Sequence, residues 1–407
     1  MIAHLEQSPS HPESAHDQYR VALAHDWLVG RRGGELVLDA IITLLNDQQH
    51  SISSIYSMFD NGTQITPAID ALPKVISKLN TLPPTLRRWQ LFRYPSATRE
   101  LSNKLFADHQ SDPIDLLIST HSSAIKAITP PNTSVPHICY CHAPARYLWS
   151  QRRAYGSRGL IGSLRVLGLQ AATPMLRKWD KAAADSVTQF VANSTHTQSQ
   201  IQEFYERDSV VIHPPVRTNF FVPRDAPKNG ALLLVSALEP YKRVDLAIEA
   251  AALAGRELLI VGSGSIEAQL RKHAQTTRTK AGSRSLIRFL GQLSDEQLLR
   301  EYQQADAFLF PQIEDFGITA VEAQAAGCPV IARRAGGSLD TVIEDHTGTF
   351  FDEPTPEAIA DAISRVHNDA KTSEHCRENA LRFSEQIFAD KMNTLITATM
   401  TNMTDAR

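Results

Sequence analysis

Cysteine is scarce in this sequence, and its four copies form no pattern that would brace a fold. They are spread over 407 residues, whereas disulfide frameworks occur in short secreted chains with closely spaced cysteines. Cys139 and Cys141 precede His142, but no second Cys/His pair at zinc-like spacing accompanies them. We therefore expect reduced thiols in a cytoplasmic protein, and a buried strand end at residues 139–141. The remaining cysteines are Cys328 and Cys376.

Long apolar runs and a strong net charge are absent too. No run reaches eighteen apolar residues, so the sequence predicts no membrane-spanning helix. Residues 1–19 lack the apolar centre of a signal peptide and are expected to form a disordered tail. A formal net charge of −3 argues against a dedicated nucleic-acid binder. The length of 407 residues and the apolar fraction of 42% fit a globular protein of two domains.

What the sequence does contain is a regular alternation of apolar strands with amphipathic helices. Such alternation predicts an α/β protein with doubly wound parallel sheets. Residues 214–230 interrupt it with a Pro-rich, aperiodic stretch that we interpret as a linker. The predicted domains are therefore residues 20–213 and residues 231–385. Strands are expected at 20–25, 51–56, 115–119, 136–141, 187–192 and 210–212 in the first domain, and at 231–236, 258–261, 287–290, 307–310, 330–332 and 349–351 in the second.

The stretch after the strand expected at 307–310 carries the strongest functional signal. Glu314 and Glu322 lie eight residues apart around an Asp-Phe-Gly turn, and helical spacing of apolar residues resumes at Ile318. A helix N-terminus offers unpaired N–H groups and the positive end of the helix dipole. This strand–loop–helix unit is therefore suited to an anion or a polyhydroxyl ligand, with two carboxylates as hydrogen-bond acceptors.

The same stretch resembles a family signature. The string E-D-F-G-I-x-x-x-E, followed by A-x-A-A-G-x-P-V-I-A, is similar to the E-x7-E motif of retaining glycosyltransferases of family 4, also called group 1. The resemblance runs from Arg20 to about Ile363. It implies the GT-B fold, in which two Rossmann-like domains face a central cleft. It also implies that the first domain binds the acceptor, that the second binds the nucleotide sugar, and that residues 386–407 form a helix crossing back to the first domain.

The resemblance assigns roles to the two carboxylates and to the backbone between them. Glu314 is expected to contact the donor sugar as a catalytic residue, and Glu322 to contact the ribose of the nucleotide. The backbone after Glu314 is expected to hold sugar and phosphate oxygens. The donor-binding residues in this backbone are Asp315, Phe316, Gly317 and Ile318.

Two cations follow the first strand of the second domain. A Lys-Arg pair by itself is typical of a solvated face, but its place after a strand favours a binding role. The resemblance implies that Lys242 meets the donor diphosphate, because a cation can stabilise the leaving charge without a metal. Many members of the family have Arg where this chain has Ala237. We expect Arg243 to supply that charge.

Glycines mark two further loops of the expected site. Gly33 and Gly34 let the backbone approach a ligand closely, and they match the glycine-rich loop that closes over the diphosphate in this family. The backbone near Gly291 is expected to contact the base. Residues 262–264, Gly-Ser-Gly, lack the third glycine of a dinucleotide fingerprint and are interpreted as a turn near the nucleotide.

The string C-H-A-P-A-R-Y-L-W at residues 141–149 narrows the resemblance. It is similar to a string in the branch of family 4 that includes bacterial O-antigen and exopolysaccharide mannosyltransferases. The strings at 25–27 and 241–246 resemble the same branch. His142 is therefore expected to contact the donor sugar or phosphate as a catalytic residue. GDP-mannose is the expected donor, with UDP-sugars as the alternative.

The expected chemistry needs no metal or other cofactor. In this family transfer is thought to proceed on one face of the sugar, and the leaving phosphate helps to deprotonate the acceptor. The sequence shows no obvious nucleophile and no Asp-x-Asp cluster. The protein would then contribute positioning and electrostatics. Two other interpretations remain open: a GT-B nucleotide-sugar epimerase, and a non-catalytic protein that binds nucleotide sugars.

Charge is uneven along the first domain. Residues 81–180 contain thirteen Lys and Arg side chains and five acidic ones, a net charge of +8. A basic amphipathic surface fits a glycan or polyprenyl-linked acceptor and a peripheral contact with the anionic inner face of the cytoplasmic membrane. A packed helix with a solvated face fits equally well. The apolar residues at helical spacing in this stretch are Leu160, Leu164, Leu167, Ala171 and Met175.

Overall fold

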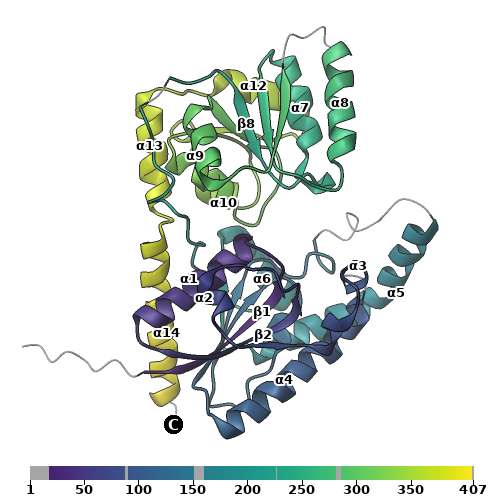
Figure 1. Ribbon diagram of the computed structural model, residues 1–407, viewed down its shortest axis with the longest axis vertical. Helices are drawn as coiled ribbons and strands as arrows, with labels where there is room; N and C mark the ends of the chain where they lie inside the picture. Colours follow the sequence, from purple (N-terminus) through teal and green to yellow (C-terminus); the bar gives the residue numbers. More distant parts are fainter. Residues whose placement is uncertain (1–17, 88–89, 151–159, 226, 281–285, 406–407) are drawn as a thin grey trace, which may run out of the picture.

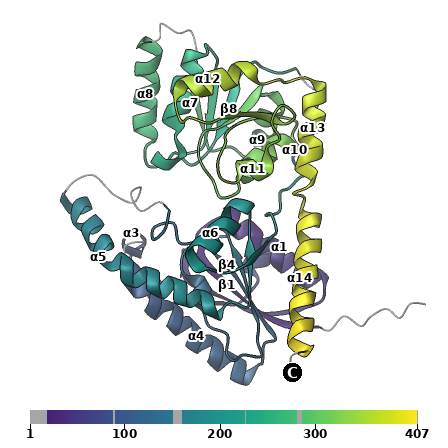
Figure 2. The same ribbon diagram turned by 180° about the vertical axis from the view of Figure 1, so that it is seen from behind.

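The computed structural model describes residues 18–87, 90–150, 160–225, 227–280 and 286–405, with the backbone alone given for residues 84–85, 160–171 and 278–280. Two α/β domains lie one above the other, and each has helices on both faces of a parallel sheet (Figures 1 and 2). The strands of the first domain are β1 (Arg20–Leu28), β2 (Ser51–Asp60), β3 (Lys74–Ile76), β4 (Leu116–His121), β5 (His137–Cys141), β6 (Gln189–Ala192) and β7 (Ser209–Val211). Those of the second are β8 (Leu232–Val235), β9 (Leu258–Val261), β10 (Ile287–Gly291), β11 (Ala307–Phe310), β12 (Val330–Arg333) and β13 (Gly348–Phe351).

The fold class expected from the alternation is confirmed. The seven-stranded sheet has the order β3-β2-β1-β4-β5-β6-β7, and the six-stranded sheet has the order β10-β9-β8-β11-β12-β13. In both, the strand order reverses next to the first strand, between β1 and β4 and between β8 and β11. Ligands of doubly wound sheets bind at that reversal, outside the carboxyl ends of the strands. The sequence did not predict β3, a three-residue edge strand without a continuous apolar run.

The helices complete the two layers of each domain. In the first domain α1 (Gly33–Asp47) and α4 (Tyr94–Ser111) pack on opposite faces of the sheet, and α10 (Ile318–Ala325) of the second domain faces α1 and α6 (Thr195–Tyr205) (Figures 1 and 2). The others are α2 (Pro67–Asp70), α3 (Pro84–Arg87), α5 (Leu160–Ala183), α7 (Val244–Leu253), α8 (Glu267–Lys280), α9 (Asp295–Gln304), α11 (Ser338–Thr341), α12 (Pro356–Arg365), α13 (Ala370–Leu381) and α14 (Glu385–Asp405).

The central strand β1 shows why the apolar runs of this sequence are continuous. Successive side chains of a strand point to opposite faces of the sheet. Val21 and Leu23 pack with α1 and α14, whereas Ala22 and Ala24 pack with α4. Because helices cover both faces, residues 21–24 are continuously apolar and show no polar alternation. The side chains of α14 that are buried in this core are Phe388, Met392 and Ile396.

The chain crosses between the domains at two places that lie side by side. One crossing is the Pro-rich segment of residues 214–230, and the other lies between α13 and α14. Val216 forms a parallel bridge with Ser384, and its N–H donates to the carbonyl of Phe383 at 2.9 Å. Helix α13 runs beside the second domain and α14 along the first (Figures 1 and 2).

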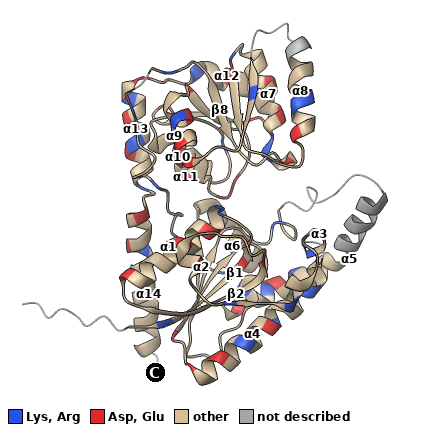
Figure 3. Ribbon diagram, viewed as in Figure 1, with Lys and Arg blue, Asp and Glu red and all other residues tan. Residues whose placement is uncertain are grey.

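The basic stretch of the first domain remains only partly described. Leu160, Leu164, Leu167 and Ala171 lie among residues whose side chains are outside the description, and Met175 is 58% exposed. On the neighbouring α4, basic and acidic side chains are mixed (Figure 3). Across the described parts of the chain, no helix combines the length and apolar character that a bilayer crossing needs. The expected tail also lies outside the description, apart from residues 18 and 19.

Candidate functional site

A cleft of about 710 Å³ separates the two domains at the point where both strand orders reverse. The loops after β1, β4 and β5 line it from the first domain, and those after β8 and β11 line it from the second. Nine of the twelve predicted site residues line this cleft, whereas Arg243, Gly291 and Glu322 do not. The nine are Gly33, Gly34, His142, Lys242, Glu314, Asp315, Phe316, Gly317 and Ile318.

Lys242 and Glu314 meet in the cleft. Lys242 ends a short 3-10 helix (Pro240–Lys242) after β8, and Glu314 lies in the loop between β11 and α10. The Lys242 Nζ and the Glu314 carboxylate form an ion pair, and the two side chains are 14% and 15% exposed. The pair therefore brings together a cation and an acceptor from two loops that are 72 residues apart in sequence.

The N-terminus of α10 opens toward the same space. Gly317 is its N-cap, with a φ of 97° and no side-chain cap hydrogen bond. A Cβ at Gly317 would come within 2.7 Å of the Phe310 ring, so only glycine fits both the backbone angle and the space. The uncapped N–H groups of the first turn are available to an anion, and the helix dipole favours negative charge there.

Gly336 and Gly337 support the loop that carries Glu314, and the sequence analysis missed them. The N–H of Gly337 donates to the carbonyl of Glu314 at 2.8 Å. A Cβ at Gly337 would overlap the backbone of Phe316, and one at Gly336 would overlap the carbonyl of Glu314. The signal was the Gly-Gly dipeptide shortly after β12, at an edge of the sheet where ligands bind.

The glycine pair of the first domain makes a close approach. A Cβ at Gly34 would lie 3.5 Å from Cε1 of His25 and 3.6 Å from Nε2 of His142. At Gly33 it would lie 3.1 Å from the side chain of Ile318, which begins α10 of the second domain. The start of α1 therefore touches the start of α10, and the small residues keep the two helix N-termini together at the cleft.

His142 follows β5 and is held through its backbone. Its N–H donates to the carbonyl of His121 at 2.7 Å, and its own carbonyl accepts from Nδ2 of Asn193 at 3.0 Å. Burial lowers the pKa of His142 to about 3, so the ring is neutral at neutral pH. The described residues offer no hydrogen-bond partner to its buried Nε2. A neutral imidazole with one unoccupied nitrogen can bind a ligand hydroxyl.

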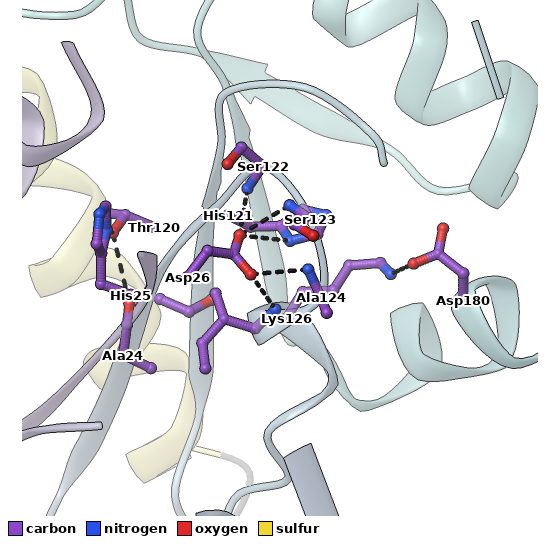
Figure 4. Close-up of polar contacts among 12 residues, drawn as sticks. Ala24, His25, Asp26, Thr120, His121, Ser122, Ser123, Ala124, Lys126 and Asp180 are labelled. Carbon is purple, nitrogen blue, oxygen red and sulfur yellow. Dashed lines mark hydrogen bonds and ion pairs between the residues drawn. The ribbon is translucent and has the colours of Figure 1, made fainter. Parts of the chain in front are cut away.

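Asp26 organises the wall of the cleft that the first domain supplies, and sequence reasoning gave it no role. Its carboxylate accepts four backbone hydrogen bonds (Figure 4): Oδ2 from Ser122 and Ser123 at 2.7 and 2.8 Å, and Oδ1 from Ala124 and Ile125 at 2.8 Å each. These donors form the loop after β4, and its two serines line the cleft. The signals were an acid directly after the core of β1 and a run of small residues after β4.

The charge of Asp26 is stable in this position. Burial alone would raise its pKa, because desolvation disfavours a carboxylate. The His121 imidazole, whose Nδ1 lies 3.6 Å from the Asp26 carboxylate, together with the backbone N–H groups, outweighs that effect and holds the pKa of Asp26 well below its usual range. The carboxylate therefore stays ionised, and it fixes the loop by charge-assisted hydrogen bonds.

Three predicted residues lie outside the cleft. The Arg243 guanidinium binds the Asp245 carboxylate at 3.1 and 3.2 Å within its own helix start. Gly291 ends β10 with a φ of 70°, and its carbonyl accepts from Gly262 at 2.7 Å. Glu322 is 8% exposed and accepts from the Tyr302 hydroxyl at 3.4 Å. Their contacts with a donor remain predictions.

Glu322 is close to a charged cluster that joins the domains. Asp295, at the start of α9, binds Arg217 at 2.6 Å and Arg31 of the first domain at 3.0 Å. Burial raises the pKa of Glu322 to about 7, and Arg217 opposes that shift. The carboxyl group is therefore protonated in part of the molecules at neutral pH, and Tyr302 is its described hydrogen-bond partner.

Comparison with known protein families finds a match for the second domain. The family model described as "Glycosyl transferases group 1" matches residues 215–383, which is less than half of the chain. This segment is a group 1 glycosyl transferase domain. It contains Lys242, Glu314 and Glu322, and therefore the donor half of the predicted site.

Curated relatives are glycosyltransferases by name. The D-inositol 3-phosphate glycosyltransferase of Mycolicibacterium smegmatis is 30% identical over 253 residues, which are 58% of this chain and 57% of the relative. D-inositol 3-phosphate glycosyltransferase 2 of Catenulispora acidiphila is 29% identical over 230 residues, 49% of this chain and 53% of the relative. The chain spans about half the length of the curated relatives it matches.

Solved structures identify the architecture. Sucrose-phosphate synthase from Thermosynechococcus elongatus superposes with a TM-score of 0.72 at 17% identity, covering 95% of this chain and 100% of that one. HepE from Anabaena in complex with UDP superposes with a TM-score of 0.66 at 17% identity, covering 92% and 100%. At such low identity the likeness concerns the fold alone. The fold is GT-B, as the resemblance of the sequence predicted.

Proposed function

We propose that this protein is a retaining glycosyltransferase that transfers mannose from GDP-mannose to a lipid-linked or polysaccharide acceptor. The observation that carries the proposal is the meeting of Lys242 and Glu314 beside the uncapped N-terminus of α10. Both lie in a cleft lined by the two domains. The match of residues 215–383 to group 1 glycosyl transferases supports the same reading of the second domain.

The donor half of the reaction is assigned to the second domain. The diphosphate lies at the N-terminus of α10, where the helix dipole and the free N–H groups stabilise negative charge. Lys242 neutralises the leaving nucleoside diphosphate, and Glu314 accepts hydrogen bonds from the sugar hydroxyls. Fixed charges of this kind, aimed at where charge develops, lower the barrier of transfer without a metal ion.

The acceptor half is assigned to the first domain. Ser122 and Ser123, in the loop held by Asp26, line that side of the cleft. Their hydroxyl groups suit a polyhydroxyl acceptor, whereas His142 of the same wall is assigned to the donor sugar or phosphate. The acceptor hydroxyl attacks the sugar carbon as the bond to the diphosphate breaks, and the leaving phosphate takes the proton. Entry and exit on one face of the sugar give retention of configuration.

The acceptor chemistry and location rest on the sequence of the first domain. The +8 charge of residues 81–180 supports an anionic acceptor, such as a polyprenyl diphosphate carrier, and peripheral binding at the inner face of the cytoplasmic membrane. Sedimentation with vesicles of anionic and of neutral phospholipid tests the membrane part. Equal binding to both would contradict it.

A UDP-sugar donor is the second candidate. HepE, which shares the fold, was crystallised with UDP and with UDP-glucose. The names of the curated relatives favour a phosphorylated polyol such as an inositol phosphate as the acceptor in that case. The base is selected by few groups, so it can differ between proteins that keep the same Lys and Glu frame.

Thermal-shift titration separates the donors. A ligand that binds only the folded state raises its melting temperature, and we expect a larger shift with GDP than with UDP or ADP. Stabilisation by UDP but not by GDP would change the assigned donor to a UDP-sugar, and the proposed glycosyl transfer would still hold. No stabilisation by any nucleoside diphosphate would contradict the proposal.

Product analysis separates the enzyme classes. A transferase releases GDP from GDP-mannose in step with glycosylation of the acceptor. An epimerase of the same fold converts the sugar without a net release of GDP. A non-catalytic binding protein is stabilised by the nucleotide sugar but leaves it unchanged.

A further inference from the structure

Arg146 reaches across the cleft from the first domain. It lies in the segment after β5 and lines the cleft. Its guanidinium forms an ion pair with the carboxylate of Asp315, and the two side chains are 29% and 9% exposed. Asp315 directly follows Glu314, the partner of Lys242. Two cations, one from each domain, therefore meet two successive acids of a single loop.

The backbone of Arg146 is held in place by its neighbours in sequence. The N–H groups of Leu148 and Trp149 donate to the carbonyl of Ala145 at 2.8 and 3.1 Å. The ring of Tyr147 packs edge-on against Tyr94 at 6.3 Å. The Nε1 of Trp149 donates to the buried Asp180 at 2.7 Å. The guanidinium thus projects from a tightly held turn, and little conformational freedom is lost when it binds a ligand.

The loop that receives Arg146 is also held by the first domain. The hydroxyl of Ser194, the N-cap of α6, donates to the carbonyl of Asp315. The charges of Asp315 and Glu314 outweigh burial and raise the pKa of Arg146 above its usual value, which keeps the guanidinium charged. A permanent cation therefore lies beside the acids that flank the N-terminus of α10.

The expected second cation of the site is engaged elsewhere. Arg243 was expected to make up for the uncharged Ala237, but its guanidinium binds Asp245 and does not line the cleft. Ala237 does line the cleft, together with Lys242 and Arg146. The first domain therefore supplies a cation to the cleft that this alanine lines.

We propose that Arg146 binds the diphosphate of the nucleotide donor together with Lys242 and makes Arg243 unnecessary for that purpose. The inference rests on the proposed function. A guanidinium binds two phosphate oxygens at once, which a lysine cannot do. Asp315 holds the guanidinium in position, and a diphosphate of greater negative charge competes for it. Because the two cations belong to different domains, one diphosphate bound by both holds the cleft closed.

Nucleoside diphosphate affinity tests the assignment. Arg146→Ala should weaken the binding of GDP, or of UDP if that is the better ligand, by about ten- to a hundredfold, the range for a lost charge-assisted hydrogen bond. Arg146→Lys should lose less. Arg99→Ala, on the exposed side of α4, is the matched control and should bind as the wild type does.

The phosphate-free ligand locates the contact. Guanosine or uridine should bind Arg146→Ala and the wild type with affinities within about twofold, because no phosphate is present to meet the guanidinium. An equal loss for nucleoside and diphosphate would overturn the proposal. If Arg146→Ala fails to fold, as judged by its melting temperature, the same comparison is made with Arg146→Gln.

A double-mutant cycle with Asp315→Asn separates diphosphate binding from a simple clasp between the domains. If Arg146 binds the diphosphate, Arg146→Ala still weakens binding at least severalfold in the Asp315→Asn background. If Arg146 only clasps Asp315, the second substitution has no effect there, and the proposal fails. A wild type that binds no nucleoside diphosphate would overturn the proposed function and this inference together. A wild type that binds well, with Arg146→Ala equal to it, would overturn this inference alone.

Discussion

The two walls of the cleft are built in different ways. In the second domain Glu314 and the N-terminus of α10 come from one short stretch of sequence, and Gly336 and Gly337 support it from the next loop. In the first domain Asp26 holds a loop that lies 96 to 99 residues further along the chain. One wall is therefore a local motif and the other is a network of distant partners. The comparison teaches that substitutions in the second-domain wall should change donor binding, whereas substitutions at Asp26 should change acceptor binding; Arg146, which reaches across from the first domain, belongs with the donor site.

The largest effect is expected at Lys242, in the donor wall. Lys242→Ala should lower turnover by about a hundred- to a thousandfold, the range for the loss of one charge-stabilising group. Lys242→Arg should retain much more activity, since it keeps the charge. Steady-state rates with and without EDTA measure both. We expect EDTA to leave the wild-type rate unchanged. Complete loss of activity in EDTA, restored by magnesium or manganese, would contradict the metal-free mechanism.

The two glutamates should then divide binding from turnover. Glu314→Gln should lower kcat by about a hundredfold, because a contact to the reacting sugar strengthens as charge develops. Glu322→Gln should weaken GDP binding by about tenfold and change kcat less, as expected for a contact made equally in ground and transition states. Calorimetric affinities and initial rates measure the two. Wild-type activity in both variants would show that the site is misassigned.

Asp26 provides the matching test in the acceptor wall. Asp26→Asn removes the charge from a buried set of four N–H donors and should lower the free energy of unfolding by about 3 kcal/mol. It should raise the KM for the acceptor by about tenfold. GDP affinity should stay within about twofold of the wild type, since no residue of the nucleotide-binding second domain changes. Denaturant unfolding and two-substrate kinetics measure these values. An equal loss of GDP affinity would break the division between the walls.

In the wall of the cleft that the second domain supplies, the sequence predicted Lys242 and the loop from Glu314 to Ile318, but it missed Gly336 and Gly337, and Arg243, Gly291 and Glu322 do not line the cleft. The apolar runs predicted twelve strands, and all twelve are present in the structure, because strands buried on both faces are continuously apolar. Glu314, Gly317 and Lys242 could be predicted to lie at the cleft because each belongs to the segment that follows such a strand. The third strand, β3, was missed because its three residues form no apolar run.

The acceptor wall and the cross-cleft contacts could not be predicted in the same way. The role of Asp26 depends on backbone N–H groups of the loop after β4, and the small residues of that loop do not specify which side chain its N–H groups bind. Arg146 was visible in the C-H-A-P-A-R-Y-L-W string, but its partner Asp315 lies 169 residues away. Arg243 was favoured from its position beside Lys242, but in the folded protein its guanidinium binds the Asp245 carboxylate.

A smaller effect is expected from Gly337, which shapes the donor wall without contacting a ligand. A Cβ at this position would overlap Phe316, and such overpacking costs about 1–3 kcal/mol. Gly337→Ala should therefore weaken GDP binding severalfold and lower the melting temperature by a few degrees, with the acceptor KM unchanged. Thermal unfolding and calorimetry measure both. Unchanged GDP affinity would show that this loop does not shape the donor site.

The smallest effect is the pH dependence contributed by Glu322. Its pKa is raised to about 7 in the folded protein from a usual value of 4.5. Between these values the folded state binds more protons than the unfolded state, so this group makes stability fall as pH rises from 4.5 to 7. Glu322→Gln should flatten that slope. Chemical denaturation at pH 5, 6 and 7 compares the two proteins, and identical slopes would contradict the assignment.

The central claim is that the cleft transfers a sugar from a nucleotide donor with the help of Lys242. The most direct test is to incubate the wild type and Lys242→Ala with GDP-mannose, with UDP-sugars in parallel, and a lipid-linked glycan acceptor, and to measure released nucleoside diphosphate and glycosylated product together. The account predicts equal amounts of the two products with the wild type, retention at the anomeric carbon, and a rate at least a hundredfold lower for Lys242→Ala. Release at the same rate in both proteins would contradict it.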